Sequence, residues 1–182
     1  MSRPNYKVRA KNLNKLVNKL RSNIKKKRSE KGKIVATLEA AEKIISNPNY
    51  WDSGSWFFVT DPEDKHNGGY IDSCASNYDE LISTCSTDSN VCGVCAEGAI
   101  YLAADSLVDG KLAIDALNST EALINISNPE LETYESIEEY VEEYGCEPEG
   151  AIMDINDSSG RLATVKAFRE GIAELKKEYK IK

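Results

Sequence analysis

Residues 161–179 read RLATVKAFREGIAELKKEY, and this stretch indicates the fold class more clearly than any other part of the chain. Its apolar residues recur every three or four positions, at Leu162, Val165, Phe168, Ile172 and Leu175. That spacing places them on one face of an α-helix, with charged side chains on the other faces. The polar run from Asp157 to Ser159 can cap the start of this helix. We therefore predict a terminal amphipathic helix over residues 161–179.

Two further helices are expected upstream, because apolar residues keep the same spacing there. The first covers residues 33–46 and ends at the turn Asn47–Pro48–Asn49. The second covers residues 91–107, where small residues suit close helix packing, and we expect it to contact the terminal helix directly. Weaker helical patterns lie around residues 78–82 and over residues 111–117, 121–126 and 135–144.

The segment between residues 50 and 70 is rich in aromatic residues and turn formers. It contains Trp51, Trp56, Phe57 and Phe58, followed by Asp61–Pro62 and Asn67–Gly68–Gly69. This composition predicts a short extended segment and turns, with rings that complete the core. The whole chain of 182 residues is about the size of one domain. We therefore predict a mainly α fold: a compact helical domain with a short, turn-rich aromatic segment and a basic amphipathic N-terminal helix.

The net charge of −7 is the sum of two unlike parts. Residues 1–33 hold 13 Lys or Arg and one acid, Glu30, for a charge of +12. The remaining residues hold 10 Lys or Arg and 29 Asp or Glu, for a charge of −19. We predict a basic amphipathic arm over residues 1–33 and an acidic helical domain over residues 34–182. Such an arm binds a polyanion, or lies on the acidic body of its own or a neighbouring chain.

The arm has two candidate binding surfaces, one apolar and one cationic. Its apolar residues follow helical spacing and predict a partner-docking face made of Leu13, Leu16, Leu20 and Ile24. Its cations predict contacts to nucleic acid or another partner from Arg3, Lys7, Arg9, Lys11, Lys15, Lys19, Arg21, Lys25, Lys26, Lys27 and Arg28.

No stretch of the sequence approaches the roughly 18 apolar residues of a membrane span, and the basic N-terminus lacks the apolar core of a signal peptide. We therefore expect no membrane partner and a cytoplasmic location. Five cysteines without an export signal favour reduced thiols over a disulfide framework.

Cys92 and Cys95 have the spacing of a zinc knuckle, but a second close pair is missing. The other ligand candidates are Cys74, Cys85, Cys146 and His66. Packing thiols and a solvated loop histidine are the favoured interpretation, with no metal and no cofactor. The sequence also has no phosphate-binding Gly-rich loop, nucleophile elbow, metalloprotease helix or kinase motif, so a catalytic role is disfavoured.

Asn156–Asp157 is a ligand-binding candidate, but capping of the terminal helix is the favoured interpretation. The glutamates of residues 135–144 fit the solvated face of an amphipathic helix better than a nucleic-acid mimic.

Three segments carry a resemblance: Pro48–Gly54, reading PNYWDSG; Cys95–Ile100, reading CAEGAI; and Asn156–Arg161, reading NDSSGR. Together they resemble an uncharacterised family of bacteriophage and actinobacterial proteins, a domain of unknown function with Cys-x-x-Gly-Ala at a helix start and Asn-Asp before the last helix. Members often have Trp where this chain has Ile155. The resemblance covers residues 34–178 and implies a compact helical fold and a phage setting, in which the location would be host cytoplasm or virion. It supplies no catalytic residues.

The sequence thus favours a small non-enzymatic binding protein whose basic arm attaches to nucleic acid or another polyanion. The alternative is a structural or host-takeover component whose N-terminal helix docks into a larger protein assembly. The partner remains open between protein and nucleic acid, and homo-oligomers are compatible with both hypotheses.

Overall fold

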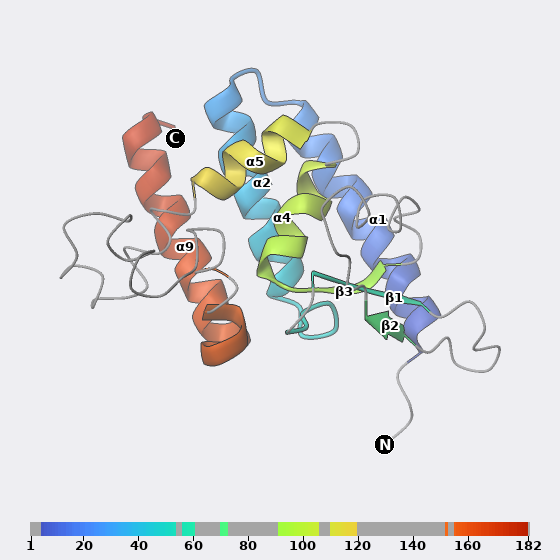
Figure 1. Cartoon of the computed structure of the whole chain (residues 1–182). Helices are drawn as coiled ribbons and strands as arrows, with labels where there is room; N and C mark the ends of the chain where they lie inside the picture. The colour runs from blue at the N-terminus through green and yellow to red at the C-terminus, as the bar shows by residue number, and fades with distance from the viewer. Residues whose placement is uncertain are drawn as a thin grey trace.

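A computed structural model describes residues 5–53, 56–60, 70–72, 91–105, 110–119, 152 and 155–181 of the chain. These residues form a mainly helical fold, as the sequence predicts, with a small sheet beside the helices (Figure 1). The helices are α1 (Tyr6–Lys25), α2 (Glu30–Ile45), α4 (Ala96–Ala104), α5 (Gly110–Asn118) and α9 (Gly160–Tyr179). The strands are β1 (Phe57–Thr60), β2 (Tyr70–Asp72) and β3 (Val91–Val94), and the π-helical turn η3 (Ile155–Ser159) leads directly into α9.

Helices α1 and α2 form a hairpin joined by a short basic turn. Side chains cap both N-termini: Asn5 Oδ1 accepts the Val8 N–H, and Ser29 Oγ accepts the Gly32 N–H, each at 3.1 Å. Helix α1 packs against α2, α4, β1 and β3. The predicted boundary at residue 33 therefore does not separate an arm from a domain, because α1 belongs to the same core as the helices that follow it.

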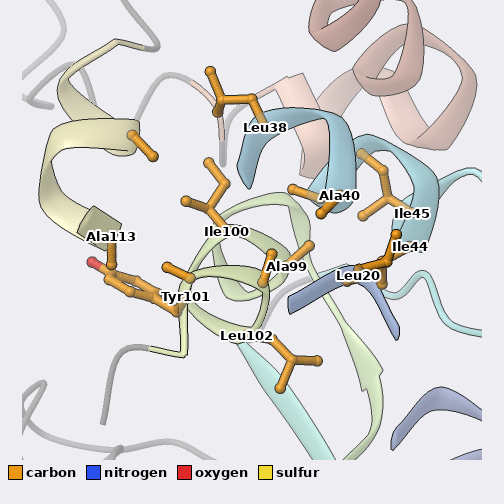
Figure 2. Close-up of a cluster of buried hydrophobic side chains, with 14 of the residues drawn as sticks. Leu20, Leu38, Ala40, Ile44, Ile45, Ala99, Ile100, Tyr101, Leu102 and Ala113 are labelled. Carbon is orange, nitrogen blue, oxygen red and sulfur yellow. The ribbon is translucent and has the colours of Figure 1, made fainter. Parts of the chain in front are cut away.

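Helix α2 lies at the centre of the fold and packs against α1, α4, α5 and α9. Figure 2 shows Leu38 and Ile44 of α2 among side chains from the neighbouring helices, including Ile100 of α4. Phe168 of α9 is fully buried, as its place on the apolar stripe predicts. The expected main contact of the central helix with the terminal helix is wrong, however, because α4 and α9 each pack on α2 instead.

The three strands form an antiparallel sheet in the order β2-β1-β3. The predicted helix over residues 91–107 is therefore wrong at its start, where Val91–Val94 is a buried strand paired with β1. Two valines and the pairing with the aromatic strand outweigh the helical pattern of this short apolar run. The helix begins only at Ala96, after Cys95 as its N-cap.

The predicted helices over residues 33–46, 111–117 and 161–179 correspond to α2, α5 and α9. The helices predicted around residues 78–82, 121–126 and 135–144 lie outside the described residues. No helix in the described part of the chain is long and apolar enough to cross a membrane.

Candidate functional site

The apolar face of α1, predicted to dock a partner, lies inside the protein. Leu13, Leu20 and Ile24 are buried in the main core, and Leu16 is partly buried against it. These side chains belong to the same core as those of α2 and α4, on which α1 packs. They are therefore not available to anchor this helix in a larger assembly.

Arg21 also points inward, although it was predicted to bind a polyanion. The residue is 8% exposed, and Nε and Nη2 donate to the Leu102 carbonyl at 2.9 and 2.7 Å. Its Nη1 lies 3.3 Å from Asp105 Oδ1, and Lys25 Nζ lies 3.9 Å from Asp105 Oδ2. Asp105 is the left-handed C-cap of α4, so Arg21 satisfies and neutralises the end of that helix. Arg21 is a structural residue.

Arg9 is partly withdrawn from solvent as well. Its guanidinium lies over the ring of Tyr6, 5.4 Å from the ring centroid, and its buried Nε has no hydrogen-bond partner. Arg3 lies outside the described residues.

Four lysines of α1 remain exposed in a single line along the helix. Lys7, Lys11, Lys15 and Lys19 are spaced by four residues, and we call them the lysine row. Side chains at this spacing are neighbours on a helix surface, and each step rises about 6 Å along the axis. Within the described residues, no carboxylate forms an ion pair with Lys11, Lys15 or Lys19, and α1 itself contains no acid. The exposed Lys26, Lys27 and Arg28 extend this charge into the turn after α1.

Three exposed lysines on other helices are paired with acids on their own helices. The pairs are Lys111 with Asp115, Lys166 with Glu170, and Lys177 with Glu174. Lys11, Lys15 and Lys19 thus differ from these three lysines, because no acid within the described residues forms an ion pair with them, and such charge favours an anionic partner.

A second candidate site is the place where the segments around residues 51, 96 and 156 meet. Asn156 is fully buried in η3, and its Oδ1 accepts Trp51 Nε1–H at 2.7 Å and the Ala96 N–H at 3.2 Å. Its Nδ2 donates to the Asp52 carbonyl at 3.3 Å and to Asp157 Oδ1 at 2.8 Å. An Asn side chain has two donors and two acceptor lone pairs, so no capacity is left for a ligand. Asn156 fastens the three segments together.

Asn156 caps a helix, as the favoured interpretation predicts, but the helix is α4 and not the terminal helix α9. Its Oδ1 binds the first N–H of α4, whereas Ser159, the N-cap of α9, makes no side-chain cap hydrogen bond. The helix that Asn156 caps starts 60 residues upstream. Capping by Asn156 therefore links η3, which leads into α9, to the start of α4.

The start of α4 is also held by the aromatic segment. Trp56 Nε1 donates to Glu97 Oε2 at 2.7 Å, and Glu97 is only 3% exposed. The Trp56 carbonyl accepts the Cys95 N–H at 3.3 Å. This carbonyl lies so close to Gly98 that a Cβ there would sit 1.9 Å from the oxygen. Gly98 is therefore required by close backbone approach.

Cys92 and Cys95 act as packing and hydrogen-bonding groups. Cys92 Sγ donates to the Phe58 carbonyl at 3.2 Å, and Cys95 Sγ accepts the Gly98 N–H at 3.4 Å. Burial raises the pKa of Cys92 to about 11 and that of Cys95 to about 12, so both thiols are protonated near neutral pH. Within the described residues, no three His, Cys, Asp or Glu side chains are placed to hold a metal ion. The other predicted ligand candidates, Cys74, Cys85, Cys146 and His66, lie outside those residues.

Comparison with protein-family models, curated proteins and solved structures found no match. The resemblance to the uncharacterised phage and actinobacterial family therefore stays a prediction. Its three segments are distant in sequence, and Asn156 joins them through the contacts to Trp51, Asp52 and Ala96. Every polar atom of the Asn156 side chain is engaged within the fold, so we assign this junction a structural role.

Arg21 of α1 is buried against its prediction as a contact residue, and Lys43 of α2 lies outside the predicted set. Arg21 follows Leu13 and Val17 at intervals of four, so its position on the buried stripe was a readable signal. Lys43 lies on the outer side of α2, beyond the basic segment, and lines a groove with α1. Only the pairing of the two helices places it near the cations of α1.

Proposed function

We propose that this chain is a small non-enzymatic binding protein that attaches to nucleic acid through the lysine row of α1. The observation that carries this proposal is the absence, in the described residues, of an acid paired with Lys11, Lys15 or Lys19. Regularly spaced phosphates match such a row, and their neutralisation releases counterions. A row of point charges recognises phosphate without reading base sequence.

The packing of α1 supports this proposal. Its apolar face is fixed in the core, so the lysines stand on a rigid helix and not on a flexible arm. A partner therefore pays little entropy to order the backbone that carries them. The acidic remainder of the chain, with a charge of −19, repels a polyanion and favours approach from the α1 side.

The cellular setting belongs to the same proposal. The resemblance to phage proteins would place the chain in the host cytoplasm or in a virion, and nucleic acid is present in both.

Replacing Lys11, Lys15 and Lys19 with Gln is expected to weaken binding to a short DNA duplex at least about tenfold. The slope of log affinity against log salt should also fall by roughly 3, because each lost phosphate contact removes about 0.9. Fluorescence anisotropy across a salt series measures both quantities. Substitution is preferable to deletion of residues 1–33, which would remove the core residues of α1.

The matched control replaces Lys111, Lys166 and Lys177 with Gln. It changes net charge by the same amount, at side chains that are 78%, 75% and 72% exposed and paired with acids. This control should bind nearly as wild type. Equal losses of affinity in both triple variants would mean that net charge alone explains the effect, which would refute a specific role of the lysine row. A wild-type salt slope in the Lys11, Lys15 and Lys19 variant would also refute the proposal.

A further inference from the structure

A groove of about 530 Å³ runs between the C-terminal half of α1 and the middle of α2. Its floor is apolar, formed by Leu20 and Ile24 of α1 and by Ala36 and Ala40 of α2. Figure 2 shows Leu20 of α1 and Ala40 of α2 among the buried side chains of the core. The small alanine side chains leave the groove open, and its volume lies in the usual range of small-ligand sites.

The rim of the groove is cationic. Lys26 and Lys27 line it from the end of α1, and Lys43 lines it from α2. Glu39 also lines it, but the Lys176 ammonium of α9 forms an ion pair with that carboxylate. The groove thus combines an apolar floor with three lysines that the structure does not pair with a described acid.

The groove continues the lysine row. Asn23 follows Lys19 by four residues and lines the groove, so it lies on the same line one turn later. The amide of Asn23 has no side-chain hydrogen bond within the described part of the chain. A strand whose phosphates lie along the row therefore reaches an amide and then the three rim lysines.

We infer that this groove receives one nucleotide of a single-stranded nucleic acid, an inference that rests on the function proposed above. The phosphate lies among Lys26, Lys27 and Lys43, and the base lies on the aliphatic floor. A duplex has its phosphates outside and its bases stacked inside, so it presents nothing apolar to that floor. A single strand exposes base faces and can bend one into a charged groove.

Lys43 provides a test that distinguishes binding in the groove from general attraction to α1, because this lysine lines the groove from α2, outside the basic segment. Lys43→Gln is expected to weaken binding to a short oligothymidylate several-fold and to lower its salt slope by about 0.7, the single-strand value for one phosphate. Binding to a duplex of the same length should be unchanged. Fluorescence anisotropy with the full-length protein measures both.

Lys166→Gln is the matched control, with the same charge change on an exposed side chain of α9. It should leave both affinities unchanged. Unaltered oligothymidylate binding by Lys43→Gln would overturn the inference, as would an equal loss for the duplex. Either result leaves the proposed function standing if the triple variant of the lysine row still loses duplex binding.

An acidic peptide has the same charge as a nucleic acid and is the competing occupant. Polyglutamate should displace oligothymidylate poorly, because it offers no planar apolar group to the groove floor. The contrary result is that polyglutamate displaces oligothymidylate when both are present at equal concentrations of anionic groups, and that Lys43→Gln abolishes this displacement. That result would assign the groove to acidic protein segments and overturn the inference.

Discussion

Gly98→Ala is expected to lower the free energy of unfolding by at least about 3 kcal/mol. Helix propensity alone gives the opposite sign, since Ala is favoured over Gly inside a helix by about 1 kcal/mol. The steric term is larger, because the new Cβ would lie 1.9 Å from the Trp56 carbonyl oxygen and 2.8 Å from its carbon. Backbone atoms cannot rotate away, so α4 and the aromatic segment must separate.

Urea denaturation followed by circular dichroism measures this change. Gly110→Ala is the control, because a Cβ on Gly110 at the start of α5 meets nothing within 4 Å. That variant should be neutral or more stable by up to about 1 kcal/mol. Equal stability of the two variants would show that Trp56 does not approach Gly98 as closely as described.

Asn156→Leu is expected to cost about 3 kcal/mol or more. Leucine is similar in size but leaves Trp51 Nε1 and the Ala96 N–H without their acceptor. Each unsatisfied buried donor costs about 1–3 kcal/mol. The Asp52 carbonyl also loses its Nδ2 donor. The loss should appear as a lower urea midpoint, with a shift in tryptophan fluorescence as Trp51 loses its partner.

Asn18→Ala serves as the comparison for this change. Asn18 is exposed on α1, and among the described residues its side chain donates to Asn14 Oδ1, at 2.9 Å. Water replaces that bond, so the stability change should stay within about 0.5 kcal/mol. A similarly small effect of Asn156→Leu would contradict the structural role of the junction.

The long helices were predictable because their apolar residues repeat over several turns. Helices α2 and α9 both match the predicted ranges closely, and each has a clear stop or start signal. Strand β3 was not predictable in the same way. Its four residues carry no period, and its pairing with β1 joins residues more than thirty positions apart.

The predicted binding residues divide according to burial. The charge pattern indicated the basic segment, but burial removes Arg21 from its candidate contacts, while Lys11, Lys15 and Lys19 are exposed. Counting could not show that α1 belongs to the core, because an amphipathic helix looks the same whether it packs on its own chain or on a partner. Lys43 was not predicted as a contact, because it lies in the part of the chain whose net charge is negative.

Asn156 was predicted to cap a helix, but the helix that it caps is α4 and not the terminal helix. A side chain that precedes a helix favours a local cap, and only the folded chain brings Ala96 within reach. The same limit applies to Gly98, whose requirement comes from the distant Trp56 carbonyl.

Lysine footprinting provides the plainest test of the lysine row as a nucleic-acid contact. The full-length protein is acetylated with and without saturating oligothymidylate, and the modified sites are quantified by mass spectrometry. Lys11, Lys15 and Lys19 should react readily in the free protein and be protected several-fold in the complex. Lys111, Lys166 and Lys177 should react equally in both. Unchanged acetylation of Lys11, Lys15 and Lys19 at saturation would contradict the proposed binding face.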